Sequence, residues 1–137
     1  WSSDVCSSDL AVTLIAAPKL VPKPWGHELI FAHTKDYVGK ILVIKAGHQL
    51  SLQFHKVKEE TIYLQSGEMR FQIENDQGQV EEFTLLPGQA FHILPNRKHR
   101  MIAVKDCEVF EVSTPQLDDV VRLEDSYGRV PGEGSVS

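Results

Sequence analysis

Four residues near the middle of the chain have the types and spacing of a metal site: Gln53, His55, Glu60 and His99. Gln53 and His55 are two positions apart, and such residues share one face of a β-strand. Glu60 follows a short lysine-containing connection and begins the next apolar segment, so a tight corner would place it opposite that pair. His99 opens another segment after a proline-containing turn. Two imidazoles, one carboxylate and one amide oxygen form a suitable ligand set for a borderline divalent cation.

The charge of such a site indicates what it would bind. Glu60 is the one negatively charged ligand, so a divalent ion held there would keep about one positive charge. Three or four protein ligands also leave a coordination position for water or substrate. An anionic oxygen ligand is then favoured, and the enediolate of an aldose–ketose isomerisation is such a ligand. We expect one divalent metal ion as the cofactor, zinc first, with manganese, iron and nickel as alternatives.

The elements that must position these residues are short β-strands. Segments rich in Val, Ile, Leu, Phe, Tyr and Thr alternate with turns that contain Gly, Pro, Asn or Asp. Short strands at close spacing predict an all-β fold, a small antiparallel barrel or double sheet. The predicted strands are residues 11–15, 28–32, 40–45, 49–54, 60–66, 69–74, 80–85, 90–94, 99–104 and 108–113.

The segment 117–127 is the one candidate for a helix. It is rich in charged side chains, among them Asp118, Asp119, Arg122 and Asp125. We expect a short salt-bridged helix that closes one end of the barrel or docks on a second subunit, rather than a catalytic element. Exposed ion pairs of this kind contribute only about 0–1 kcal/mol each.

The length of 137 residues suits one domain, and 42% hydrophobic with 24% charged residues is ordinary for a globular protein. We expect the domain to span residues 11–129. Residues 1–10, dominated by Ser and Asp, form an expected disordered or non-native tail, and 130–137 an expected disordered C-terminal tail.

Several partners are excluded by charge and hydropathy. The formal net charge is −5 and no long basic run occurs, so nucleic acid is not expected. No apolar run approaches the roughly 20 residues that cross a bilayer, so no membrane association is expected. Cys6 and Cys107 are two distant cysteines that provide no disulfide framework. A cytoplasmic location is the simplest expectation.

Residues 47–67 resemble the first sequence motif of the cupin family, in which a glycine, a His-x-His pair, a glutamate and a second glycine follow at fixed spacing. Gln53 stands at the position of the first histidine. The second cupin motif is represented by Gly88 and His99, with Pro95 beside the expected proline. The proline, second glycine and asparagine positions of that motif are changed here. The resemblance implies a jelly-roll barrel, and a homodimer is an expectation from cupins in general.

Within the cupins, the chain more closely resembles the mannose-6-phosphate isomerase domain of type II phosphomannose isomerases. Three stretches carry this resemblance: KPWG at 23–26, LSLQFH at 50–55 and DDVVRLEDSYGR at 118–129. In that family glutamine is the usual first metal ligand. GDP-mannose synthesis is not expected, because the nucleotidyltransferase domain that often precedes this module is not in this sequence.

The resemblance implies a metal-dependent aldose–ketose isomerase that acts on a phosphorylated sugar such as mannose 6-phosphate. Arg100 resembles the arginine that follows the ligand histidine in the family and is a predicted catalytic residue together with Glu60. On a strand it faces away from His99, unless the rim of the barrel bends. Lys98, in a basic cluster with Arg100, and His92 are predicted substrate contacts. Candidates for the proton-transfer base are metal-bound hydroxide, Glu60 and His92.

Two other functions fit the same ligands. A redox-active metal would support an oxygenase, which dissolved-oxygen consumption would reveal. A non-catalytic cupin would bind sugar or metal without turnover. One barrel fold hosts many activities, so the fold alone does not separate these functions.

Overall fold

The computed structural model describes residues 17–130. The predicted strand at 11–15 and the predicted tail at 1–10 lie outside this range, and so does the predicted tail at 130–137 except for its first residue. In the described part the chain forms strands and turns, and no helix there is long and apolar enough to cross a membrane. The strands are β1 (Lys19–Lys23), β2 (Gly26–His33), β3 (Val38–Ile44), β4 (Leu52–Phe54), β5 (Glu60–Ser66), β6 (Met69–Glu74), β7 (Val80–Leu85), β8 (Ala90–Ile93), β9 (His99–Ala103), β10 (Cys107–Ser113) and β11 (Val121–Glu124).

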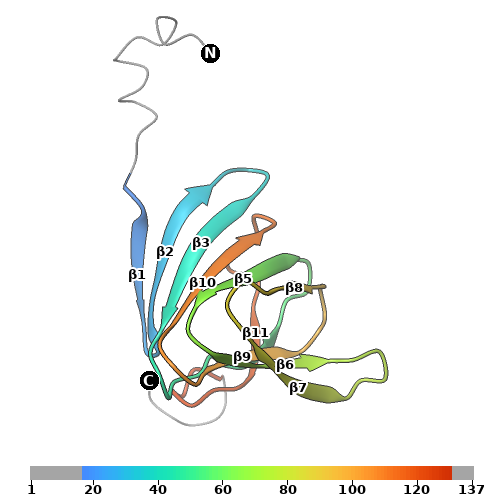
Figure 1. The fold of residues 1–137 in the computed structure, drawn as a ribbon. Coiled ribbons are helices and arrows are strands. Elements are labelled where there is room, and N and C mark those ends of the chain that lie inside the picture. The colour runs from blue at the N-terminus through green and yellow to red at the C-terminus, as the bar shows by residue number, and fades with distance from the viewer. Residues whose placement is uncertain (1–16, 131–137) are drawn as a thin grey trace, which may run out of the picture.

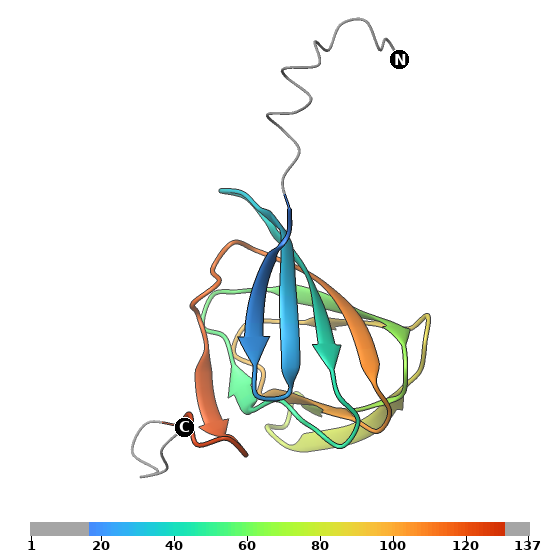
Figure 2. The same cartoon turned by 90° about the vertical axis from the view of Figure 1, so that its left-hand side faces the viewer.

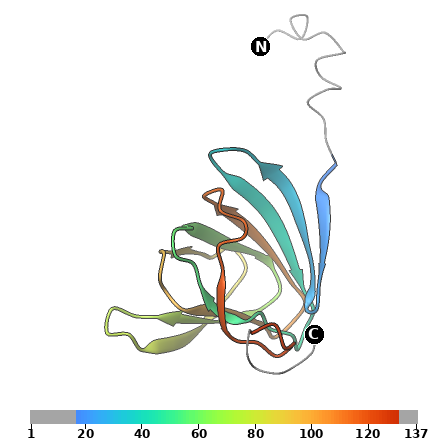
Figure 3. The same ribbon diagram turned by 180° about the vertical axis from the view of Figure 1, so that it is seen from behind.

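The strands form two antiparallel sheets (Figure 1). One sheet has the order β1-β2-β3-β10-β5-β8, and the other has the order β11-β4-β9-β6-β7. From β3 onward most connections pass from one sheet to the other, so β10 pairs between β3 and β5 while β9 pairs between β4 and β6. The predicted all-β, double-sheet architecture is confirmed. Figures 2 and 3 show that β1 and β11, one edge strand from each sheet, lie on the same side of the molecule.

The interior between the sheets has an apolar end and a polar end. In β10 the side chains of Cys107, Val109, Glu111 and Ser113 are buried, because alternate residues of a strand share one face. The register places Val109 beside apolar residues of β3 and β5, whereas Glu111 lies beside Lys40. The apolar end forms the core, where each fully buried large side chain contributes roughly 1.5–3 kcal/mol. Its members include Leu42, Ile44, Ile62, Leu64, Met69, Phe71, Met101 and Val109.

Two elements differ from the sequence prediction. β1 was not predicted, because Pro22 and two lysines interrupt its pattern; it is an edge strand, where a proline is tolerated. The helix predicted for 117–127 is wrong. This segment contains turns and then β11, which pairs antiparallel with β4. The adjacent β-branched residues Val120 and Val121 favour extended backbone, and β4 supplies the hydrogen-bonding partner.

Candidate metal centre

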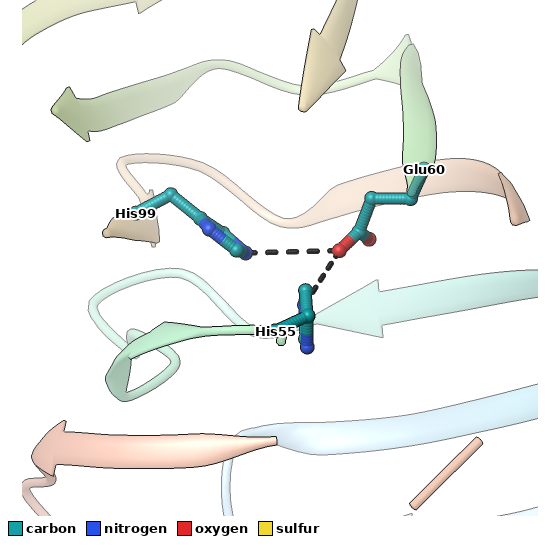
Figure 4. A group of neighbouring side chains, drawn as sticks. All are labelled: His55, Glu60 and His99. Atoms are coloured by element: carbon teal, nitrogen blue, oxygen red, sulfur yellow. Dashed lines mark ion pairs between the residues drawn. The ribbon is translucent and has the colours of Figure 1, made fainter. Parts of the chain in front are cut away.

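Three predicted ligands meet at the polar end of the interior (Figure 4). His55 follows β4 directly, Glu60 begins β5 and His99 begins β9. Their ligand atoms all lie within 4.8 Å of one another, and the three residues are only 1–3% exposed. Oε2 of Glu60 is 2.6 Å from Nε2 of His55 and 3.7 Å from Nε2 of His99. We call these three residues the metal-ligand group.

Both imidazoles are oriented by backbone carbonyl groups. Nδ1 of His55 donates to the carbonyl oxygen of Asp119 at 2.6 Å, and Nδ1 of His99 donates to that of Arg97 at 2.9 Å. A carbonyl oxygen only accepts, so Nδ1 carries a proton in each ring. When a ring is neutral, its Nε2 therefore has a lone pair available for a metal ion. Proteins commonly orient metal-binding histidines by such a contact.

The three facing atoms fit a bound cation. Nε2 of His55, Oε2 of Glu60 and Nε2 of His99 are buried and make no hydrogen bond of good geometry within residues 17–130. A buried polar atom without a partner costs about 1–3 kcal/mol and is rare in native proteins. Three electron-pair donors directed at one another need a positive charge between them. Two histidines and one carboxylate suit zinc and other first-row divalent metals.

Gln53 lies next to this group. Its Cα pairs with that of His99 in the β4–β9 register, and the two side chains therefore share a face. Its Oε1 accepts a hydrogen bond from Oγ of Ser51 at 2.7 Å. The assignment of Gln53 as a fourth ligand stays a prediction.

Burial and neighbouring charges set the protonation of the ligands. Burial alone would raise the pKa of Glu60, but the contacts with His55, Lys58 and His99 hold that pKa below its usual range. Burial lowers the pKa of His99, which keeps the imidazole neutral. Both shifts favour the unprotonated forms of Glu60 and His99 that metal binding requires.

A row of alternating charges leads away from Glu60 across the first sheet. Nζ of Lys58 lies 4.0 Å from Glu60 and 3.1 Å from Glu111, while Nζ of Lys40 lies 3.7 Å from Glu111 and 3.4 Å from Glu28. Burial and the charge of Glu60 raise the pKa of Glu111 to about 7, opposed by Lys40 and Lys58. Burial opposes a raised pKa at Lys58, but Glu111 and Glu60 outweigh it. We call these residues the charge ladder.

Asp119 fixes the connection between His55 and Glu60. Its carboxylate accepts hydrogen bonds from the backbone N–H groups of Lys56, Val57 and Lys58 at 3.0, 2.7 and 2.8 Å. These bonds lower the pKa of Asp119 to about 2. Sequence reasoning missed this role, because the contact joins segments about sixty residues apart and no local pattern signals it.

A cavity of about 260 Å³ adjoins the metal-ligand group, with Gln53 and Glu60 in its wall. Its lining is strongly charged, with more cationic side chains than carboxylates. The cationic residues are Lys19, Lys23, Lys40, Lys58, Arg122 and Arg129, and the acidic residues are Glu28, Glu60, Glu111 and Asp118.

The other predicted site residues do not line this cavity. Nε of Arg100 donates to the carbonyl oxygen of Leu50 at 3.0 Å, and Nη2 donates to that of Glu124 at 2.9 Å, so its guanidinium holds the end of β11. The catalytic role of Arg100 stays a prediction. Lys98 donates its backbone N–H to Glu74. The exposed imidazole of His92 pairs with an exposed carboxylate, that of Glu59.

Residues 14–125 match the model of the family described as mannose-6-phosphate isomerase, C-terminal. The chain belongs to this family. A curated relative, the mannose-1-phosphate guanylyltransferase ManC of Salmonella typhimurium, is 34% identical over 115 residues. That alignment covers 80% of this chain and 23% of the relative, so the chain spans about a quarter of the relative's length.

Similar solved structures show the fold of this family member. KdgF from Halomonas sp. has a TM-score of 0.64 at 22% identity, covering 73% of this chain and 88% of KdgF. Oxalate decarboxylase from Bacillus subtilis has a TM-score of 0.67 at 15% identity, and the match covers 77% of this chain and 30% of the decarboxylase chain. CapF from Staphylococcus aureus has a TM-score of 0.65 at 16% identity, and the match covers 78% of this chain and 34% of CapF. The predicted jelly-roll barrel of the cupin type is confirmed.

Proposed function

We propose that the protein is a metal-dependent aldose–ketose isomerase that acts on a phosphorylated sugar such as mannose 6-phosphate. The supporting observation is the convergence of three buried donor atoms without hydrogen bonds beside a cavity with a largely cationic lining, whose wall includes Glu60 and Gln53, in a member of this family. A divalent metal held there would supply a Lewis acid for the sugar oxygens on either side of the proton to be moved.

The metal-ligand group would hold the ion, with Gln53 as a fourth ligand. Since Asp119 and Arg97 already orient the two imidazoles, little reorganisation is needed when the ion binds. Groups that are already in place before the reaction stabilise the charge that develops in the transition state more effectively than groups that must first rearrange. Zinc is the first expectation, with manganese, iron and nickel as alternatives. Oxalate decarboxylase of B. subtilis, a protein of the same fold, holds Mn(II) centres.

Isomerisation transfers one proton from the carbon beside the aldehyde to the former aldehyde carbon, while a hydroxyl proton moves between the two oxygens. No oxidant is consumed, but a side chain must accept and return the carbon-bound proton. Glu111 and Lys58 form a buried pair in the cavity wall, next to Glu60. We assign the transfer to Glu111, with Lys58 holding its carboxylate in position. His92 is exposed and pairs with Glu59, so we do not assign the transfer to it.

The experiment is elemental analysis of the purified protein together with a coupled mannose 6-phosphate isomerase assay, with and without chelator. We expect near-stoichiometric metal and turnover that chelator abolishes and added metal restores. Glu111→Gln should lower kcat at least about 100-fold with metal content retained, within the range for loss of a general base. The matched control Glu82→Gln changes a glutamate whose partner is the exposed Arg70.

Other results would contradict the proposal in distinct ways. Stoichiometric metal without turnover of any hexose or pentose phosphate would favour a binding protein. Consumption of dissolved oxygen with a bound substrate would favour an oxygenase. Full activity in Glu111→Gln would overturn the assignment of the proton transfer alone.

A further inference from the structure

Three cationic side chains in the cavity wall come from the edge strands β1 and β11 and from the segment after β11. Lys23 ends β1, Arg122 lies in β11 and Arg129 follows β11. Burial lowers the pKa of Lys23, and Lys40, Arg122 and Arg129 lower it further against the opposing effect of Glu28. Like charges are therefore close enough to repel one another. We call Lys23, Arg122 and Arg129 the cation group.

The positive charge of this group is only partly neutralised. Asp125 holds Arg129 through two hydrogen bonds of 2.7 and 2.9 Å. Within residues 17–130, however, the ammonium of Lys23 and the guanidinium of Arg122 make no ion pair, and Nε of Arg122 is buried without a hydrogen-bond partner. Glu28, the nearby carboxylate, pairs with Lys40. A partly buried arginine that has an unpaired N–H donor and lies beside a second cation destabilises the folded protein unless an anion binds to it.

The strand register relates the cation group to the metal centre. Arg122 lies directly opposite Gln53 in the β11–β4 pair, and Gln53 lies opposite His99 in the β4–β9 pair. Directly paired residues project from the same face of a sheet, so all three side chains point to the interior. Neighbouring strands are about 4.8 Å apart, which puts the backbone at Arg122 roughly 10 Å from that at His99. One ligand of sugar-phosphate length can therefore reach both groups.

We propose that Lys23, Arg122 and Arg129 form the subsite for the phosphoryl group of the substrate. This inference rests on the proposed function and places the phosphate on the edge strands rather than on Lys98 and Arg100. A phosphate monoester carries nearly two negative charges near neutral pH and accepts paired hydrogen bonds from a guanidinium. Two uncompensated cations match that charge better than they match a single carboxylate. The sugar end would then extend toward the metal-ligand group.

The test is calorimetric titration of inorganic phosphate into the metal-loaded protein and its variants. We expect Lys23→Gln and Arg122→Gln each to weaken phosphate binding by about tenfold or more, and Arg122→Lys to restore part of it. The control Arg70→Gln, at an exposed arginine paired with Glu82, should bind as the wild type does. His99→Ala should keep the binding, which shows that the probe is not simply held by the metal.

A kinetic comparison separates this inference from the isomerase proposal. Lys23→Gln and Arg122→Gln should raise KM for mannose 6-phosphate far more than KM for mannose. If wild-type turnover is present but these variants behave as Arg70→Gln does, the subsite is wrong and the isomerase stands. If turnover is absent while phosphate binding still depends on Lys23 and Arg122, the isomerase is wrong and the subsite stands. Equal binding of glucuronate and phosphate, lost together in Arg122→Gln, would overturn the phosphoryl assignment.

Discussion

The metal-ligand group and the cation group share one interior but are built differently. His55, Glu60 and His99 are almost completely buried, and backbone carbonyl groups fix both rings. Lys23 and Arg122 come from edge strands and are only partly buried. The first group has its geometry set before anything binds, whereas the second has charge in place and side chains that can adjust.

This difference matches what each proposed ligand would require. A first-row metal tolerates little error in the position of its ligands, so its donors belong on paired inner strands and their connections. A phosphoryl group offers three oxygens and accepts several arrangements of donors, so long side chains on edge strands suffice. The charge ladder starts at Glu60, and its buried members are two lysines and two glutamates: Lys40, Lys58, Glu60 and Glu111.

The largest effect is expected from removing one fixed ligand. His99→Ala should abolish metal binding and lower kcat/KM by about 1,000-fold or more, since Lewis-acid stabilisation contributes several kcal/mol. Elemental analysis and the coupled assay measure both, and circular dichroism checks that the fold is retained. His33→Ala, at an exposed histidine, is the control. A fully active His99→Ala protein would exclude the metal mechanism.

Breaking the charge ladder at Lys58, which also holds Glu111 in position, should reduce stability. Lys58→Met leaves Glu111 and Glu60 facing each other, and removal of one partner from a buried charge network costs about 3–5 kcal/mol. Urea unfolding measures this loss. The double variant Lys58→Met/Glu111→Leu should recover part of it, because the uncompensated carboxylate is also removed. An additive double variant would show that the two side chains do not interact.

A smaller effect is expected where Asp119 supports the metal ligands from outside. Asp119→Ala removes the acceptor of three backbone N–H groups between His55 and Glu60. We expect metal affinity to fall about 10–100-fold, the range seen when outer contacts of a metal site are lost. Competition with a chromogenic chelator measures the affinity, with Asp36→Asn as the control at an exposed carboxylate. Unchanged metal affinity would show that Asp119 supports the site through its backbone carbonyl alone and that its carboxylate does not contribute.

The smallest effect concerns the cation group and depends on pH. The hydrogen bond from Arg129 is the main cause that lowers the pKa of Asp125 below its usual 3.8. A carboxyl whose pKa is lower in the folded state stabilises the protein above its unfolded pKa, and this stabilisation is lost as the pH falls through the folded pKa. The free energy of unfolding of the wild type should therefore exceed that of Asp125→Asn by about 1 kcal/mol or less at pH 6, as measured by urea unfolding. This difference should disappear below pH 4. A gap independent of pH would refute this account.

Sequence patterns predicted the inner strands and the metal-ligand group because both depend on short-range signals. Alternation identifies β5 and β10, and the spacing of His55 and Glu60 across a tight corner is local. His99 lies in a separate segment of the sequence, but it could also be predicted from a local signal, because it opens a strand after a turn.

The cation group was not predicted, because both of its strands were misread. Pro22 interrupts the pattern of β1, and the charges around Arg122 suggested a helix. Only the pairing of β11 with β4 shows that Arg122 shares a face with Gln53. Such a pairing joins residues far apart in the sequence, and local propensity carries no information about it.

The place of β11 near the end of the described chain also has a consequence for biosynthesis. During translation, His99 leaves the ribosome before Asp119 and Arg122 do. A nascent chain that stops short of residue 119 would contain every proposed metal ligand, yet lack the carbonyl that orients His55 and most of the cation group. Since chains begin to fold from the N-terminal side, the barrel would gain its complete site only when this last segment docks.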